Sequence, residues 1–545
     1  MYQTQYLDKP CRNFCILGAT PFVDPKDGLP KFAAVSFANF VCGTLYLIDP
    51  RANTAEQYTL PADNGSWAVH NCDNKELIIA TCAEGAYIHC FDLESRTFTH
   101  MTRVETDTYI WDLVDGGDGY LYGGTYENCK LIRYHMASHT LEDLGRIDPN
   151  PENMYVQNVR AVPGYILADA GQVVKTTYAY RQSDGVILPL ADVKDEINEA
   201  CAVRKTDHKR FSLADGSIVG INGQEYFFCE NETAEPICRR IPGEAPATGI
   251  LTLCGDGKGK IWGATNFGLT FFNYDTVTGS YENSGNVTTY GGGEFYGMRV
   301  CDGKVYMTAY ANGFHVVYDP AQPWDVQNNV NPRTLKAIEP AYIRPHGRTV
   351  VGPNGTIWTG WMAKYGVYGG ALSKIDTATD EVTVYPVGDR GVASVAADDK
   401  FVYYATDGCG NGMPTLEKGP FTFAAVDACG NEVFSASLPE DVYPMAVYTD
   451  AQMDAVLLCT KTDCRVYKKD LSEQIAMLPI ARSECAARFD DKLIVFGNDR
   501  KIFAVDPTTF AYEEIGSTTD GVRCAYQEGD ALYYPCGLEL WKLTK

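Results

Sequence analysis

The stretches Gly117-Asp-Gly-Tyr-Leu-Tyr-Gly123 and Leu131-Ile-Arg-Tyr-His135 contain the pattern that decides the fold. The Asp-Gly pair in the first stretch supplies the positive backbone angles that a two-residue hairpin turn requires, and a short aromatic strand follows it. The second stretch is a further apolar strand that leads into another turn. Each copy of the pattern therefore predicts a four-stranded antiparallel meander.

This pattern recurs along nearly the whole chain. An apolar strand that ends in Asp or His occurs nine times, at intervals of 36 to 57 residues and with one gap of 140 residues. The copies end at Asp49, Asp92, His135, Asp275, Asp319, Asp376, Asp427, Asp470 and Asp506. Two degenerate copies in the long gap, near 180–184 and 228–231, and a partial unit at 531–543 bring the total to about twelve. A unit of about 45 residues with four short strands is typical of a propeller blade.

The number of units bears on the domain organisation. Single propellers usually hold about 4 to 8 blades, so we predict an all-β protein with two tandem propellers, at residues 1–289 and 290–545, joined at the glycine run 290–293. A division into seven and five units would move the boundary to the Pro-rich segment 332–345. The alternative is a single propeller over residues 1–545, with seven or eight blades and long insertions.

The end of the chain predicts how a ring would close. The last unit stops one strand short, and a ring leaves no open strand edge. We therefore expect the N-terminal segment to complete the final blade.

Composition argues against several functions. The chain has 46 Lys+Arg and 70 Asp+Glu, a formal charge of −24, which disfavours nucleic acid or an anionic membrane as a partner. No apolar run approaches the roughly 18 to 20 residues of a membrane span, and the N-terminus shows no secretory signal, so we expect a cytoplasmic protein. The 19 cysteines lie mostly in apolar surroundings without a C-x-x-C pair. We interpret them as reduced core residues and expect no metal ion and no cofactor.

The repeat resembles β-propeller proteins of the quinoprotein-like and virginiamycin-B-lyase-like kind, and the resemblance covers nearly the whole chain. Propellers of seven or eight blades that look like this one include polysaccharide lyases. The resemblance implies a His or Tyr as acid and base, and an Arg or Lys that binds a uronate carboxylate. What carries over is the type of chemistry, because propellers host many functions.

The candidate site follows from propeller geometry. The first strand of each blade lines the central channel, so side chains near the starts of these strands converge although they are far apart in the sequence. Arg binds a carboxylate with a planar fork, Tyr and Trp faces suit sugar rings, and His and Tyr transfer protons. The predicted catalytic residues are His346, Tyr296, Arg299 and Arg348, and the predicted substrate-binding residues are Arg344, Trp361, Lys364, Tyr109, Asp112, His70 and Arg160.

Within this set we expect different roles. His346, flanked by Arg344 and Arg348, is the predicted acid and base, and Arg299 and Arg348 are the predicted carboxylate clamp. The aromatic insertion 360–369 is interpreted as a loop that covers the substrate. His70, Asp112 and Arg160 would form a separate site in the first half of the chain. Each of these residues has a structural alternative, such as packing, inter-blade salt bridging or a hairpin extension.

The predicted function is a carbohydrate-active enzyme, a lyase that cleaves uronate-containing oligosaccharides by β-elimination. Neutralising the carboxylate, removing the proton beside it and protonating the leaving oxygen are the steps that Arg, His and Tyr side chains can supply. The alternatives are a non-catalytic propeller that acts as a scaffold or binds a ligand, and a glycoside hydrolase with paired carboxylates.

Overall fold

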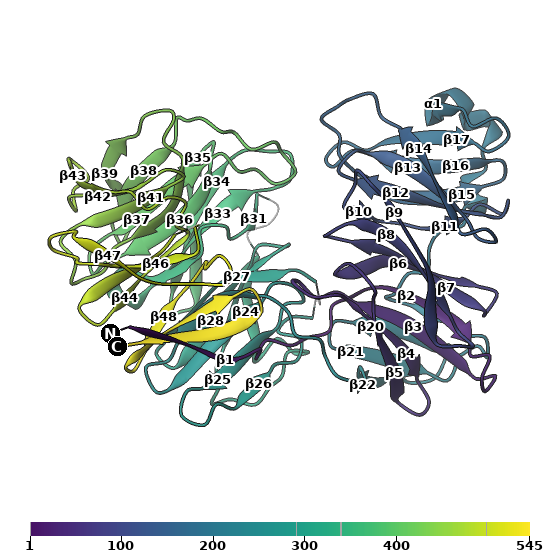
Figure 1. Cartoon of the computed structure of the whole chain (residues 1–545), viewed down its shortest axis with the longest axis horizontal. Coiled ribbons are helices and arrows are strands. Elements are labelled where there is room, and N and C mark those ends of the chain that lie inside the picture. Colours follow the sequence, from purple (N-terminus) through teal and green to yellow (C-terminus); the bar gives the residue numbers. More distant parts are fainter. Residues whose placement is uncertain (1, 290–291, 338–340, 498) are drawn as a thin grey trace. The chain divides into compact units, whose positions relative to one another are not determined.

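The computed structural model describes residues 2–289, 292–337, 341–497 and 499–545 (Figure 1). Within these residues the chain forms eleven antiparallel sheets and one short α-helix, α1 (Leu190–Val193). Nine sheets have four strands and one has five. The remaining sheet has nine strands because β10 (Tyr109–Ile110) pairs with strands of two neighbouring meanders. The predicted all-β class and the repeated four-stranded unit are confirmed.

The predicted hairpin chemistry is visible in the sheet that starts with β27 (Glu294–Cys301). Cys301 pairs with Lys304 at the start of β28 (Lys304–Tyr310). Between them, Asp302 and Gly303 have φ angles of 50° and 78°. Two successive positive φ angles are those of a type I′ turn, which matches the right-handed twist of the two strands.

The chain divides into two compact units. The smaller unit comprises Phe14–Pro246, and the larger comprises Met1–Asn13 together with Ala247–Lys545. The predicted boundary between residues 289 and 290 lies inside the larger unit, after β26 (Tyr281–Asn283). Residues 290 and 291 of the predicted glycine linker lie outside the described residues.

The larger unit contains seven sheets in its described residues. The sheets run from β23 (Ile250–Gly255) to β26, from β27 to β30 (Arg333–Ala337), from β31 (Tyr342–Arg344) to β35 (Glu381–Gly388), from β36 (Gly391–Ala397) to β39 (Glu432–Ser437), from β40 (Pro444–Tyr448) to β43 (Gln474–Leu478), from β44 (Cys485–Phe489) to β47 (Tyr512–Ser517), and from β48 (Tyr526–Glu528) to β50 (Glu539–Thr544) with β1 (Gln3–Asp8).

The first strands of these sheets contact one another. β23 contacts β27, and β27 contacts β32 (Thr349–Val351), which lies in the third sheet. β32 contacts β36, β36 contacts β40, β40 contacts β44, and β44 contacts β48. β48 contacts β23. Buried apolar side chains fill the space between neighbouring sheets, as Trp262 and Phe271 do against Phe295 and Met298. These contacts are compatible with a propeller-like fold.

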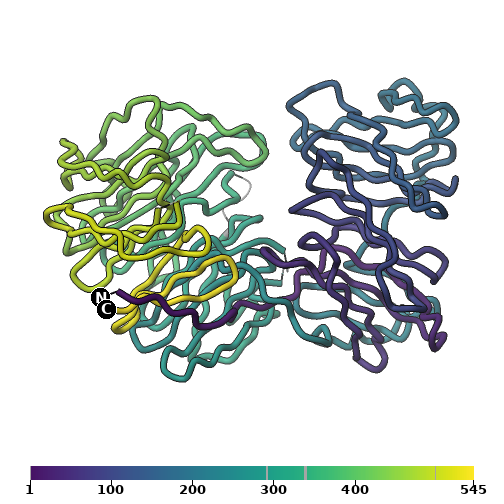
Figure 2. Tube along the Cα trace, in the orientation of Figure 1, coloured from purple at the N-terminus to yellow at the C-terminus, as the bar shows by residue number. Residues whose placement is uncertain are grey.

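The N-terminal strand completes the last sheet of the larger unit, as predicted. β1 pairs antiparallel with β50, so that Thr4 lies opposite Leu543 and Tyr6 opposite Trp541. Figure 2 shows the first and last strands side by side, in purple and yellow. Because of this pairing, the larger unit contains both ends of the chain, and its first 13 residues are separated from the rest by the whole smaller unit.

The smaller unit is built from meanders of the same kind. They run from β2 (Ile16–Val23) to β5 (Thr54–Thr59), from β6 (Gly65–Cys72) to β9 (Thr97–Val104), from β11 (Val114–Asp115) to β14 (Thr140–Arg146), from β15 (Val156–Val162) to β18 (Ile187–Pro189), and from β19 (Phe211–Ser212) to β22 (Ile237–Arg240). β10 joins the second and third meanders into the nine-stranded sheet. β2 contacts both β6 and β19, and β12 (Tyr120–Tyr126) contacts β15.

Two further sequence predictions concern cysteines and membranes. Cys201, Cys238 and Cys429 are exposed, whereas the other cysteines are buried or half-buried, and all are free thiols. Most of them therefore pack as small apolar side chains. Among the described residues, no helix combines the length and the apolar character that crossing a bilayer requires.

Candidate functional site

A cavity of about 470 Å³ lies in the larger unit, along the first strands of its sheets. Its lining comes from residues 252 and 255 and from the segments 299–300, 348–351, 394–397, 446–449, 484–488 and 523–527. The charged residues in this lining include four arginines, Arg299, Arg348, Arg488 and Arg523. We call this space the arginine cavity. Residues that are hundreds of positions apart meet there because each sheet contributes its first strand.

Two of these arginines have no carboxylate partner. Among the described residues, no Asp or Glu lies within 4.0 Å of the guanidinium of Arg299 or Arg348. Instead, Arg299 Nη1 donates hydrogen bonds to the carbonyl oxygens of Met298 (2.7 Å) and Leu253 (3.3 Å). Arg348 Nη1 donates to the carbonyl of Leu251 at 2.7 Å. Each guanidinium is thus anchored to the backbone, while its charge stays available to an anion.

Arg348 also has an unusual backbone. Its φ angle is 67°, in the left-handed region that few residues other than glycine adopt. Such conformations cost of order 1–3 kcal/mol and cluster at functional sites. Glycine would suit this backbone conformation better than arginine does.

The other two arginines of the cavity, Arg488 and Arg523, are each paired with a carboxylate. Arg488 donates from Nε and Nη2 to both carboxylate oxygens of Asp450, at 2.9 and 3.0 Å. Arg523 lies 3.1 Å from Glu484, and both of these side chains are largely exposed. An exposed pair of this kind is worth little and exchanges partners readily. Arg523 can therefore turn toward a bound anion more easily than Arg488 can.

Tyr296 and Arg344, both predicted site residues, lie together at the start of the second and third sheets. Arg344 Nη1 donates to Tyr296 Oη at 3.0 Å, and the guanidinium lies 4.1 Å from the ring centre of Tyr310. Tyr310 in turn shares a hydrogen bond with Tyr365. The Arg344 charge therefore has aromatic neighbours, which stabilise a cation without neutralising it.

Glu294 is a buried carboxyl beside this group. Its side chain is 7% exposed, and among the described residues Oε2 has no hydrogen-bond partner. Burial raises the pKa of Glu294 to about 7, although the nearby Arg344 opposes this shift. A carboxyl that titrates near neutral pH can accept or release a proton under physiological conditions.

Tyr296 lies two residues after Glu294 in β27, and neither side chain is part of the lining of the arginine cavity as far as the structure describes it. Burial and the charge of Glu294 raise the pKa of Tyr296 to about 12, while Arg344, Arg348 and Arg523 oppose the shift. Two of these arginines line the arginine cavity. At neutral pH the Tyr296 phenol is therefore protonated, which suits a proton donor.

The His346 side chain is paired with a carboxylate. It is not part of the lining of the arginine cavity as far as the structure describes that lining. Its Nε2 donates to Asp407 Oδ2 at 3.0 Å, and Asp407 Oδ1 accepts from the backbone nitrogen of Cys409 at 3.0 Å. Burial lowers the pKa of His346, but Asp407 and Cys409 outweigh it and raise the pKa to about 9. The imidazole is therefore a cation at neutral pH.

The same cluster has the composition of a metal site. One ligand atom each from His346, Asp407 and Cys409 lies within 4.8 Å of the other two. Cys409 Sγ also lies 3.4 Å from Tyr443 Oη. The ion pair between His346 and Asp407 already accounts for two of the three groups, so the contacts require no metal ion.

The predicted loop 360–369 contains two kinds of residue. Trp361 lies in β33 (Ile357–Ala363), is 0% exposed and donates from Nε1 to Ser373 Oγ at 2.7 Å. It therefore packs in the core and does not face the cavity. Lys364 and Tyr365 follow the strand and are exposed. Only this later part of the insertion can reach a ligand.

Two charged site residues predicted in the smaller unit, Arg160 and Asp112, have oppositely charged neighbours. Arg160 donates to Asp169 at 2.9 Å and to Glu199 at 3.2 Å. Asp112 is buried, accepts from the backbone nitrogen of Val159 at 2.8 Å and lies 4.0 Å from Lys205. Burial raises the pKa of Asp112.

His70 is half-buried, and burial lowers its pKa. Among the described residues, it is not found in either cluster of potential metal ligands. The structure therefore does not gather His70, Asp112 and Arg160 into a charged cavity like that of the larger unit.

Tyr109 instead belongs to an aromatic cluster of the smaller unit, which consists of Trp67, Tyr109, Trp111, Tyr126 and Tyr155. The Tyr109 and Trp111 rings stack at 4.9 Å, and Trp67 lies 4.9 Å from Trp111. All five side chains are half-buried. Lys205 Nζ donates to the carbonyl oxygens of Trp67 and Trp111, at 3.1 and 2.9 Å.

Two carboxylates of this geometry, Glu294 and Asp407, are not among the predicted site residues. Glu294 precedes two predicted residues in its strand, and Asp407 lies in a glycine-rich stretch that suggested no role. Their importance comes from burial and from neighbours in other sheets, which no local pattern reports. No protein-family model matches the chain, and no curated protein matches it either.

Proposed function

We propose that the larger unit is a propeller-type enzyme that binds a carboxylate-bearing carbohydrate in the arginine cavity and cleaves it by β-elimination. The observation that carries the proposal is the pair Arg299 and Arg348, two cations without carboxylate partners in the described residues of a chain with a formal charge of −24. In the proposed arrangement the seven sheets are blades, and the cavity lies along their common axis.

The carboxylate of a uronate is the natural partner for two such guanidinium groups. Arg presents a planar fork that matches both oxygens of a carboxylate, and the pair would be stronger in a partly water-excluded cavity than in bulk water. Neutralising the carboxylate makes the neighbouring carbon–hydrogen bond more acidic. Arg523 can add a third charge by leaving Glu484.

The elimination needs one base and one acid. We assign the base to Glu294, whose pKa of about 7 leaves it ionised in a useful fraction of molecules. The base takes the proton from the carbon beside the carboxylate, and the electron pair of that bond forms a carbon–carbon double bond as the glycosidic carbon–oxygen bond breaks. The acid protonates the leaving oxygen. Tyr296 and His346 are both protonated at neutral pH and are the two candidates for this acid.

The pH dependence of turnover distinguishes these two acids. With Glu294 as the base, kcat/KM should rise as the pH passes about 7. If His346 is the acid, the rate should fall again near pH 9, whereas Tyr296 would keep the rate high to a pH of about 12. A rate that is flat through pH 7 would contradict the role of Glu294.

The decisive test of the reaction is spectroscopic. The wild-type protein is mixed with a panel of uronate oligosaccharides, and the near-ultraviolet absorbance of the unsaturated product is followed over time. The proposal expects this band to grow with the wild type and to stay flat with Glu294→Gln. New reducing ends without the band would instead identify a hydrolase, and binding without any product would identify a non-catalytic protein.

The aromatic cluster of the smaller unit supports a second candidate function, carbohydrate binding without catalysis. Stacked, half-buried Tyr and Trp rings offer apolar faces to sugar rings. The indole nitrogen of Trp111 is buried and has no hydrogen-bond partner among the described residues, so a sugar hydroxyl could accept its hydrogen. Tryptophan fluorescence should then shift on titration with neutral oligosaccharides, and Trp111→Phe should abolish the shift. A wild-type signal that does not change would remove this candidate.

A further inference from the structure

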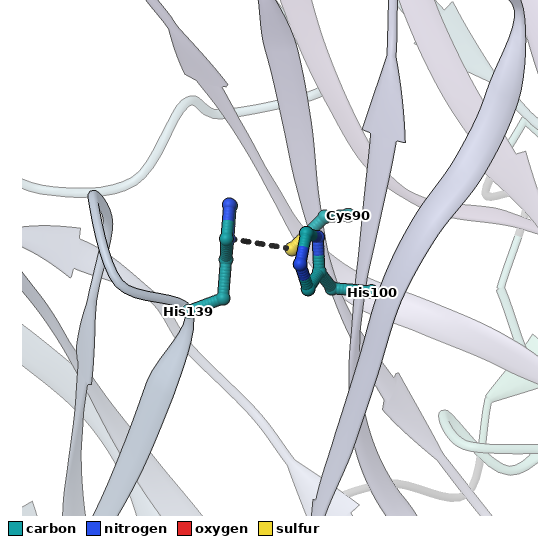
Figure 3. Close-up of side chains that lie close together, drawn as sticks. All are labelled: Cys90, His100 and His139. Atoms are coloured by element: carbon teal, nitrogen blue, oxygen red, sulfur yellow. Dashed lines mark hydrogen bonds between the residues drawn. The ribbon is translucent and has the colours of Figure 1, made fainter.

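A second group of chemically active side chains lies in the smaller unit and plays no part in the proposed reaction. Cys90 lies on β8 (Ala86–Asp92), His100 on β9, and His139 in the turn between β13 (Lys130–His135) and β14. One ligand atom of each residue lies within 4.8 Å of the other two (Figure 3). We call these three residues the cysteine–histidine cluster.

One of its distances is close to that of a tetrahedral metal site. Zinc binds sulfur at about 2.3 Å and nitrogen at about 2.0–2.1 Å, so two such ligand atoms are roughly 3.5 Å apart in a tetrahedron. Cys90 Sγ and His139 Nδ1 are 3.4 Å apart. The His100 ring stacks on the His139 ring at 3.9 Å, and its side chain is exposed. A rotation of this exposed side chain can direct a ring nitrogen toward the same point.

The surroundings favour one ring nitrogen of His139 as the ligand. Nε2 of His139 faces Glu76 Oε1 at 3.9 Å, on the side away from the sulfur contact made by Nδ1. Metal-bound histidines usually direct their other ring nitrogen at a carboxylate, which fixes the tautomer. Tyr134 Oη lies 2.9 Å from Nδ1 and 2.7 Å from Cys90 Sγ, so it also holds the two ligand atoms together.

We propose that Cys90, His100 and His139 bind one Zn²⁺ ion, with Glu76 as the carboxylate that orients His139. One thiolate and two imidazoles suit zinc, whereas calcium and magnesium prefer oxygen ligands. The fourth position would be taken by water on the exposed side of His100. Because Cys90 and His139 belong to successive meanders, the ion would also link these two parts of the smaller unit.

Burial of Cys90 has a cost that the bound ion must offset. Cys90 is 0% exposed, and burial raises the pKa of its thiol to about 11. Zn²⁺ deprotonates a thiol that it binds, so uptake of the ion should release protons. Without a metal ion, Cys90, Tyr134 and His139 would form a hydrogen-bonded group only, and this is the competing explanation.

Zinc binding to the full chain tests the proposal. The metal-free protein is titrated with Zn²⁺ against a competing chromophoric chelator, and Co²⁺ is used in parallel for its thiolate charge-transfer band. We expect one tightly bound ion and a raised melting temperature. Both effects should be lost in Cys90→Ser and in His100→Ala, and Glu76→Gln should weaken binding by about 10- to 100-fold.

Two controls make the result specific. His135→Ala removes a half-buried histidine of β13 outside the cluster, and Cys409→Ser removes the thiol of the His346 cluster in the larger unit. Both should retain the tight site. Since His100 is exposed, His100→Ala keeps the test informative even if Cys90→Ser does not fold. Zinc affinity in His100→Ala equal to that of the wild type, or no competition with the chelator in the wild type, would overturn the proposal.

Discussion

The arginine cavity of the larger unit and the charged residues Arg160 and Asp112 of the smaller unit lie in the same kind of repeat, yet the two sets of charges differ in their partners. In the larger unit, Arg299 and Arg348 are held by backbone carbonyls and have no carboxylate partner among the described residues. In the smaller unit, Arg160 has two acidic partners and Asp112 faces Lys205.

The presence or absence of a carboxylate partner distinguishes a structural ion pair from a cation that can bind a ligand. A guanidinium that already contacts two carboxylates gains little from a further anion. A guanidinium that is held by backbone carbonyl oxygens has a positive charge that no carboxylate neutralises. Its position is also set before a ligand arrives. The comparison therefore supports the proposed anion site in the larger unit and favours a structural role for Arg160.

The largest expected effect is on turnover, at the proposed base Glu294. Glu294→Gln keeps the size of the side chain but removes the base, so kcat should fall by about 10² to 10⁴ while uronate binding changes little. Tyr296→Phe should give a similar loss if Tyr296 is the acid. The measurement is the initial rate of product absorbance, with circular dichroism to confirm folding. A Glu294→Gln variant with wild-type turnover would remove the proposed base.

Next in size is the loss of uronate affinity on removing Arg348. Arg348→Gly relieves the left-handed backbone and removes the guanidinium, so the fold should be retained while uronate binding weakens at least tenfold.

Arg482→Gly is the matched control for this substitution. Arg482 also has a positive φ angle, 50°, but it is exposed and does not line the described cavity. Titration calorimetry should give wild-type affinity for it. Equal affinity losses in the two variants would show that the effect comes from the backbone and not from the charge.

In the smaller unit, Arg160→Ala should lower stability and leave turnover unchanged. Arg160 is 6% exposed, and its removal takes away the ion-pair partner of Asp169, which among the described residues keeps only the hydrogen bond from Thr177 Oγ1 at 2.7 Å. We expect a loss of about 1–3 kcal/mol in the free energy of unfolding. Arg181→Ala, which breaks an exposed pair with Asp184, should change little. Urea denaturation measures both. Reduced turnover in Arg160→Ala at full stability would contradict the structural role.

The smallest expected effect is the pH dependence of stability that His346 contributes. Its pKa in the folded protein, about 9, lies above the ordinary value of 6.5. The stabilisation by Asp407 is therefore fully present below about pH 6.5 and is lost as the pH rises through about 9. The melting temperature of the wild type should fall over this interval more than that of His346→Gln. Parallel curves for the two proteins would show that the ion pair does not form.

The sequence predicted the local unit well because turn chemistry is local. The Asp-Gly pair at 302 and 303 has the φ angles that its hairpin requires, and β1 pairs with β50, as the missing strand of the last unit predicted. The division into units depends instead on contacts between the two ends of the chain, which a glycine-rich stretch near residue 290 does not reveal.

The candidate site was only partly predictable for a related reason. Arg299 and Arg348 were identified from their places at strand starts, and they do line one cavity. Trp361 looked like part of an exposed insertion, but it continues the buried strand β33 and bonds to Ser373. Glu294 has an ordinary sequence context, and its shifted pKa comes from burial by other segments.

The most direct test of the central claim compares two ligands that differ only in the carboxylate. A uronate oligosaccharide and its carboxyl-reduced, neutral counterpart of the same length are titrated into the Glu294→Gln protein, so that no turnover disturbs the heat signal. If Arg299 and Arg348 form an anion site, the uronate should bind at least tenfold more tightly than its neutral counterpart. Raising the salt concentration should reduce this difference in affinity, because salt screens the charges. Equal affinity for the two ligands would contradict the claim.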